Sequence, residues 1–174
     1  MFNGIKKEIK NLLLNCIEHV RRKCSEWVEK TVDAMFIHSQ VPKIGSVVYC
    51  NLVGAFEHTG IYVGHGEIVH LNGNGMIEKV NYKQFVGRLE GFNPAFSIFC
   101  ATDSYGKVIS DKSIAERALE MVGSKKSYNL IYDNCHCFTA YCLNGSNLVM
   151  GYFSIIEMLL KQDFSFDSWR AINI

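Results

Sequence analysis

Two histidines and one cysteine have the residue types of a nucleophilic site. His58 and His70 stand twelve positions apart in residues 57–73 (EHTGIYVGHGEIVHLNG), and Cys135 stands in residues 128–145 (YNLIYDNCHCFTAYCLNG). An imidazole can activate a thiol for attack on an acyl group, and a third group can orient the imidazole. We therefore consider Cys135 as a nucleophile, His58 as its base and His70 as the group that orients or polarises the base.

A β-hairpin is needed to bring the two histidines together. If residues 64–66 form a three-residue turn, Val63 faces Glu67 and opposed residue numbers sum to 130. In that register His58 and His70 are diagonal neighbours on one face of the sheet, within reach of each other. A two-residue turn would move them to opposite faces, so the prediction depends on the turn.

A helix is needed to present the cysteine. Asn134 is a favourable N-cap, and Asn144-Gly145 is a typical helix end, which predicts a helix from Asn134 to Leu143. Cys135 would then lie in the first turn, where unpaired backbone N–H groups and the helix dipole lower the pKa of a thiol. The same N–H groups can stabilise an oxyanion.

Short β-branched or aromatic runs separated by Gly and Asn predict an antiparallel meander. These runs are residues 44–53, 58–63, 67–71 and 76–80, and a further strand is expected around residues 96–101. A capping-box pattern from Ser113 to Glu116 predicts a helix through Val122, with Gly123 as its stop.

The N-terminal segment differs from this β-rich region. Residues 5 to about 37 carry apolar side chains at spacings of three to five, which predicts an amphipathic helix. We interpret it as a helical extension (1–40) of a domain formed by residues 41–174. Trp27 and clustered basic residues also suit an interfacial membrane helix. The apolar segment 148–160 is a second candidate for membrane contact, although about 1.5 Å per residue makes it too short to cross a bilayer.

Composition bounds the class of protein. The chain has 174 residues, 48% of them hydrophobic, and 18 Lys and Arg against 17 Asp and Glu. These values fit one globular domain, exclude a largely disordered chain and argue against nucleic acid as the ligand. The number of cysteines is odd, at seven, which favours reduced thiols over a set of disulfides. The apolar run at residues 12–14 is too short for the hydrophobic part of a signal peptide. We expect a cytoplasmic protein, at most peripheral to a membrane.

The combined motifs resemble the lecithin:retinol acyltransferase family. That family carries H-W-x-x-Y-V-G-x-G-x-x-V-H-L and later N-C-E-H-F-V. The counterparts here are HTGIYVGHGEIVHL at residues 58–71 and NCHCFT at residues 134–139. The segment AERALEMVGSKKSYNL at residues 115–130 is also similar, and the motif-bearing part covers about residues 42–145.

The resemblance implies an α+β fold, a circularly permuted papain-like domain whose antiparallel sheet precedes the nucleophile helix. It assigns Cys135 as the nucleophile, His58 as the base and His70 as the third member, with no cofactor and no metal. The implied chemistry is that of a thiol-dependent acyltransferase or phospholipase A. A phospholipid or other acyl substrate would transfer its acyl group to Cys135 as a thioester. Water, an amine or a hydroxyl would then accept that acyl group.

The sequence departs from the family pattern close to the site. The tryptophan after the first histidine is Thr59, and Phe56 replaces a tyrosine that is frequent in the phospholipase members. The Glu-His pair after the nucleophile is His136-Cys137. We expect His136 to be a surface residue or a support of the site. These changes leave the lipid class and the acyl acceptor open.

Three other functions compete with this interpretation. A peptidase or amidase of the same superfamily would use the same cysteine and histidines on an amide. A non-catalytic binding module would keep the fold without the reaction. A zinc site could use Cys135, His136 and Cys137 with the two histidines, although Cys-x-Cys is not the usual zinc spacing.

Overall fold

The computed structural model describes residues 40–52, 56–87, 98–129, 134–145, 147 and 151–172. The chain divides into two compact units, Met1–His38 and Ser39–Ile174, and every described residue belongs to the second unit. The amphipathic helix predicted over residues 5–37 lies outside the described residues and stays a prediction.

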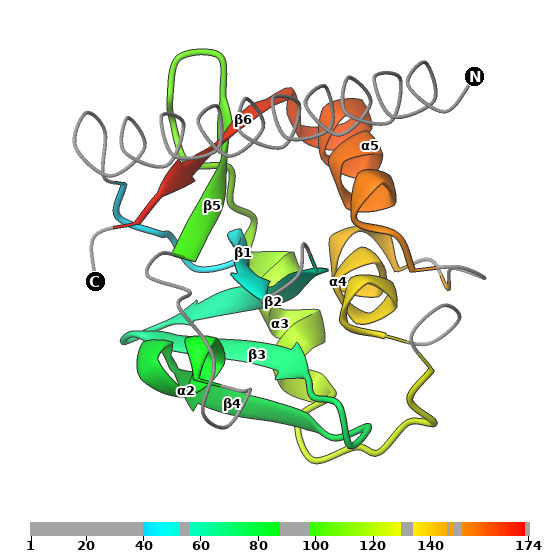
Figure 1. The fold of residues 1–174 in the computed structure, drawn as a ribbon. Helices are drawn as coiled ribbons and strands as arrows, with labels where there is room; N and C mark the ends of the chain where they lie inside the picture. Colours follow the sequence, from blue (N-terminus) through cyan, green and yellow to red (C-terminus); the bar gives the residue numbers. More distant parts are fainter. Residues whose placement is uncertain are drawn as a thin grey trace, which may run out of the picture. The chain divides into compact units, whose positions relative to one another are not determined.

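The described residues form a six-stranded antiparallel sheet in the order β4-β3-β2-β1-β5-β6 (Figure 1). The strands are β1 Val47–Leu52, β2 Phe56–Gly64, β3 Glu67–Leu71, β4 Ile77–Asn81, β5 Ile98–Asp103 and β6 Phe166–Ala171. Strands β1 to β4 follow one another in space as in the chain, so the predicted meander is confirmed. Strand β6, which pairs with β5, was not predicted, because its segment FDSWRA mixes charged and apolar residues.

Helices cover both faces of the sheet. They are α2 Tyr82–Val86, α3 Lys112–Glu120, α4 Cys135–Asn144 and α5 Phe153–Phe164. On one face α3, α4 and α5 pack over Val47 and Val69, and on the other face α2 places Phe85 against Val48 and Ile68. Successive strand residues therefore serve two cores, as the pleat requires. The predicted α+β class is confirmed.

The register of the histidine hairpin agrees with the prediction although its turn does not. Strand β2 pairs with β3 through Ile61↔Val69 and Tyr62↔Ile68, so opposed residue numbers sum to 130 as expected. The predicted three-residue turn is wrong, because Gly64 rather than Val63 pairs with Glu67.

A two-residue turn and a β-bulge together produce this result. His65 and Gly66 occupy the turn with φ of 53° and 75°, the left-handed conformation that tight hairpin turns with matching twist require. The register shifts between Tyr62 and Gly64, so Val63 is an extra residue on β2. The bulge returns the strand to the register that puts both histidines on one face.

The predicted cap of the cysteine helix is confirmed. The Asn134 side chain accepts hydrogen bonds from the backbone N–H groups of His136 (2.9 Å) and Cys137 (3.2 Å), and Gly145 ends α4 with φ of 76°. The capping box predicted for α3 is wrong. Its N-cap is Asp111, whose carboxylate accepts from the Ser113 N–H at 2.8 Å, so the helix begins earlier than predicted.

The apolar segment near the C-terminus contributes to helix α5. This helix buries Ile156, Leu159 and Leu160 against the domain and leaves Met158 exposed. Among the described residues, no helix combines the length and apolar character needed to cross a bilayer.

Candidate active site

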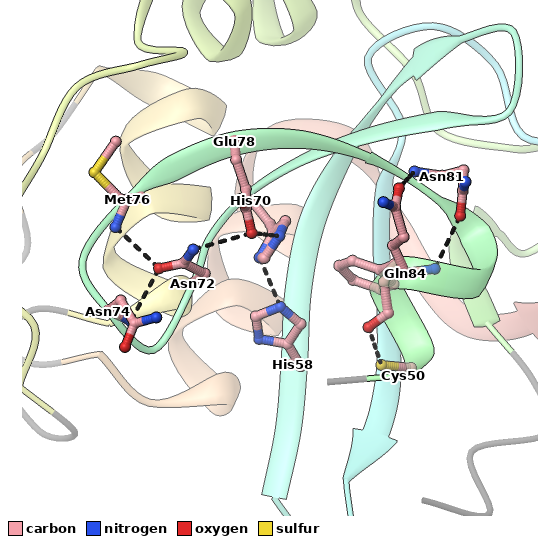
Figure 2. A network of polar contacts seen from close by, with 10 residues as sticks. Cys50, His58, His70, Asn72, Asn74, Met76, Glu78, Asn81 and Gln84 are labelled. Atoms are coloured by element: carbon pink, nitrogen blue, oxygen red, sulfur yellow. Dashed lines mark hydrogen bonds and ion pairs between the residues drawn. The ribbon is translucent and has the colours of Figure 1, made fainter. Parts of the chain in front are cut away.

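The hairpin brings the two histidines into direct contact. Nε2 of His58 lies 2.9 Å from Nδ1 of His70, and both side chains are buried, with 6% and 0% of their surface exposed (Figure 2). Phe85 of α2 packs on both rings, at 5.0 Å and 5.6 Å between ring centroids. The expected pairing of the histidines is therefore present.

Gly60 makes the close packing around the histidines feasible. A Cβ at this position would lie 2.7 Å from Cγ2 of Ile68 and 3.1 Å from Cε2 of Phe85. Both distances are shorter than ordinary van der Waals contact, so only glycine lets β2 approach these side chains so closely.

A carboxylate stands on the far side of the histidine pair. Glu78 of β4 is the direct cross-strand partner of His70, and its Oε1 lies 3.5 Å from His70 Nε2. The same oxygen accepts a hydrogen bond of 3.0 Å from Nδ2 of Asn72 (Figure 2). The sequence analysis missed Glu78. No local sequence pattern marks it, because its place opposite His70 follows from the β3–β4 register, in which paired residue numbers sum to 148.

Cys135 is the first residue of α4 and is 4% exposed. Burial raises the pKa of its thiol, whereas hydrogen bonds from the backbone N–H and hydroxyl of Thr59, and from its own and the His136 backbone, lower it. The net effect is a raised pKa, so the resting group is a thiol that needs a base.

The thiol lies beside the backbone of strand β2. Because N–H groups alternate along a strand and Tyr62 N–H bonds to Ser46 next to β1, the Thr59 N–H points away from β1. The β2–β3 pairs end at Ile61, two residues after Thr59. The Cys135 sulfur therefore contacts the Thr59 N–H on the edge of β2 that faces β3, just outside the paired part of the strand. Thr59 adjoins His58 in the chain, but its side chain faces α4 while His58 faces Phe85 of α2.

Thr59 and His136, two of the residues that depart from the family pattern, lie in one buried network. Thr59 Oγ1 lies 3.1 Å from Nδ1 of His136 and accepts a hydrogen bond of 2.9 Å from the Thr139 hydroxyl. His136 Nδ1 is also 4.0 Å from the Cys135 sulfur. The prediction that His136 is a surface residue is wrong; of the two expectations, it is the supporting position that fits. Burial lowers the pKa of His136 to about 4, so its imidazole is neutral at pH 7.

Other thiols lie outside this arrangement. The cysteines of the described residues are buried and form no disulfide; besides Cys135 they are Cys50, Cys100, Cys137 and Cys142. Burial raises the pKa of Cys100 and Cys142 to about 12, which makes them poor nucleophiles. In the part of the chain that the structure describes, no three His, Cys, Asp or Glu side chains are grouped to hold a metal ion.

The family model for lecithin retinol acyltransferase matches residues 40–148, more than half of the chain. The chain belongs to the lecithin retinol acyltransferase family. His58, His70 and Cys135 all fall inside the matched range. Strands β1 to β5 precede the cysteine helix and β6 follows it, an α+β arrangement consistent with a papain-type fold. No curated protein matches the chain.

Proposed function

We propose that this member of the family is a thiol-dependent acyltransferase or phospholipase A that acts on phospholipid esters through Cys135. The observation that carries the proposal is the buried 2.9 Å contact between His58 and His70, on a strand whose next residue hydrogen-bonds to the Cys135 sulfur. His58 is the proposed base and His70 the residue that orients it.

The proposed reaction has two halves. His58 takes the thiol proton, and the Cys135 sulfur attacks the ester carbonyl carbon to form a tetrahedral oxyanion. When the oxyanion collapses, the C–O bond breaks and the lysophospholipid leaves with the proton from the imidazolium. Water, an amine or a hydroxyl then attacks the thioester, gives its proton to His58 and releases the thiol.

Charge stabilisation comes from groups already in contact with the sulfur. The N–H groups of Thr59, Cys135 and His136 favour the thiolate, which offsets part of the cost of its burial. The N–H groups of His136 and Cys137 already donate to the Asn134 side chain, so the Cys135 N–H is the donor at the start of α4 that we assign to the oxyanion. The raised pKa explains why a base is needed and why free thiolate is scarce at rest.

The test uses phosphatidylcholine liposomes with and without a primary amine. Wild type is compared with Cys135→Ala and with Cys137→Ala, a second cysteine of the same helix, and lipid products are measured by mass spectrometry. We expect fatty acid or N-acyl amine from wild type and Cys137→Ala and none from Cys135→Ala. Product that survives Cys135→Ala contradicts the proposal, and a wild type that cleaves only amide substrates favours the peptidase interpretation.

Contact with a lipid surface is part of the proposal because the substrate resides there. The candidates are the N-terminal segment and residues 148–160. A variant that lacks residues 1–37 should bind liposomes more weakly than the full chain, and unchanged binding removes the N-terminal segment as a candidate. The odd cysteine count supports the expected cytoplasmic location.

A further inference from the structure

We propose that Glu78 is a positioning residue of the active site, and that it fixes the protons of His70 and His58 so that Nδ1 of His58 carries no proton and can act as the base. This inference rests on the proposed role of His58. It adds a carboxylate to the cysteine and the two histidines of the proposed site. It also assigns which nitrogen of each imidazole carries the proton.

Glu78 contacts His70 through an ion-pair distance rather than a short hydrogen bond. His70 is fully buried, and its Nε2 lies 3.5 Å from Oε1 of Glu78 on the adjacent strand. An ionised carboxylate only accepts hydrogen bonds, so it favours the form of His70 that carries its proton on Nε2. The electrostatic preference acts at this distance even where the hydrogen-bond angle is imperfect.

The position of the carboxylate is itself fixed. Asn72 donates from Nδ2 to Oε1 of Glu78 at 3.0 Å. The Oδ1 of Asn72 accepts from the backbone N–H groups of Asn74 (2.9 Å) and Met76 (3.0 Å), which orients the amide so that its NH₂ must point to Glu78 (Figure 2). The β3–β4 turn thus holds Glu78 next to His70.

The proton on His70 determines which nitrogen of His58 carries a proton, because the two rings are in contact. With its proton on Nε2, neutral His70 has a bare Nδ1, which can only accept. The partner atom 2.9 Å away is Nε2 of His58, which must therefore donate. Neutral His58 with its proton on Nε2 has a bare Nδ1, and a bare ring nitrogen is what a base for the Cys135 thiol needs.

His58 becomes positively charged when it takes the proton of the thiol. When His58 takes the thiol proton, the imidazolium is one hydrogen bond from His70, which is next to the Glu78 carboxylate. The carboxylate stabilises that positive charge, in the manner of the third member of a catalytic triad. The Glu78 side chain is 40% exposed, so solvent screens the effect.

The direct test reads the protons without any substrate. Long-range ¹H–¹⁵N NMR spectra of the full chain should show the proton of His70 on Nε2 and that of His58 on Nε2. In Glu78→Gln, the fraction of His70 with its proton on Nδ1 should rise. A proton on Nδ1 of His70 in wild type, or a Glu78→Gln spectrum identical to wild type, overturns the inference.

The sequence offers a matched control for this variant. Glu67 lies on the same pair of strands, bonds to Lys79 at 2.8 Å and is 39% exposed, but it faces away from the histidines. Glu67→Gln removes one carboxylate at equal exposure and should leave the histidine spectra unchanged.

Kinetics then test the functional consequence. We expect kcat/KM for phosphatidylcholine to fall up to about 5-fold in Glu78→Gln, because the carboxylate is partly screened, and by less than about 2-fold in Glu67→Gln. The acidic limb of the pH profile of kcat/KM should move to lower pH in Glu78→Gln, because the His58 imidazolium loses the carboxylate that stabilises it. If Glu78 has only a structural role, the acidic limb stays where it is in wild type. If wild type does not turn over phospholipid, the proposed function fails and the NMR result alone decides the role of Glu78.

Discussion

Replacing Thr59 with valine tests the buried network next to the thiol. The change keeps the shape of the side chain and removes the hydroxyl that contacts His136 at 3.1 Å and Thr139 at 2.9 Å. Both partners are buried, with 8% and 0% of their surface exposed, so water cannot replace the lost contacts. A buried polar group left without a partner costs about 1–3 kcal/mol, and two such groups predict a loss of about 2–6 kcal/mol in the free energy of unfolding.

Chemical denaturation of purified variants measures this loss. Thr59→Ser keeps the hydroxyl and should lose only about 1 kcal/mol for the methyl group. The double variant Thr59→Val, Thr139→Val should lose less than the sum of the single variants, because it removes both ends of one hydrogen bond. Equal stability of Thr59→Val and wild type refutes the view that the network contributes to folding.

Three further predictions concern the surroundings of the site. Gly60→Ala should disturb the histidine pair, since its Cβ would lie 2.7 Å from Ile68 Cγ2; loss of the His58–His70 hydrogen bond in NMR spectra is expected, and an unchanged spectrum contradicts it. Phe85→Ala should lower the free energy of unfolding by about 3–5 kcal/mol through the cavity it leaves, measured in urea; a loss below about 1 kcal/mol argues against tight packing on the histidines. Burial lowers the pKa of His136 from 6.5 to about 4, so its neutral form stabilises the fold above pH 6.5 and this stability is lost as pH falls toward 4; His136→Gln should flatten that slope, and an unaltered slope counts against the prediction.

The sequence predicted the parts of the site that depend on local patterns. Asn134 and Gly145 predicted the ends of α4, and the hairpin has the predicted register although that register was derived from a turn of the wrong length. The turn was predicted wrongly because a β-bulge is defined by the pairing of two strands. The sequence of one strand does not show which residue is the extra one. The register survived because burial of alternate residues specifies it more strongly than the turn does.

The missed features depend on contacts between distant segments. Glu78 reaches His70 only through the β3–β4 pairing, and a glutamate on a strand has no sequence mark that separates it from a solvated one. His136 was expected either at the surface or in support of the site, because helical spacing alone does not reveal that Thr59, 77 positions earlier, contacts it. Strand β6 forms because β5 offers it a partner, not because its own residues favour a strand.

The central claim is that Cys135 carries the acyl group. The most direct measurement incubates the full chain with phosphatidylcholine, quenches in acid and maps the acylated peptide by mass spectrometry before and after treatment with neutral hydroxylamine, which cleaves thioesters. The account predicts an acyl mass on the peptide that contains Cys135, removed by hydroxylamine and absent in Cys135→Ala but retained in Cys137→Ala. Lipid turnover without that adduct in wild type, or an adduct that persists in Cys135→Ala, contradicts it.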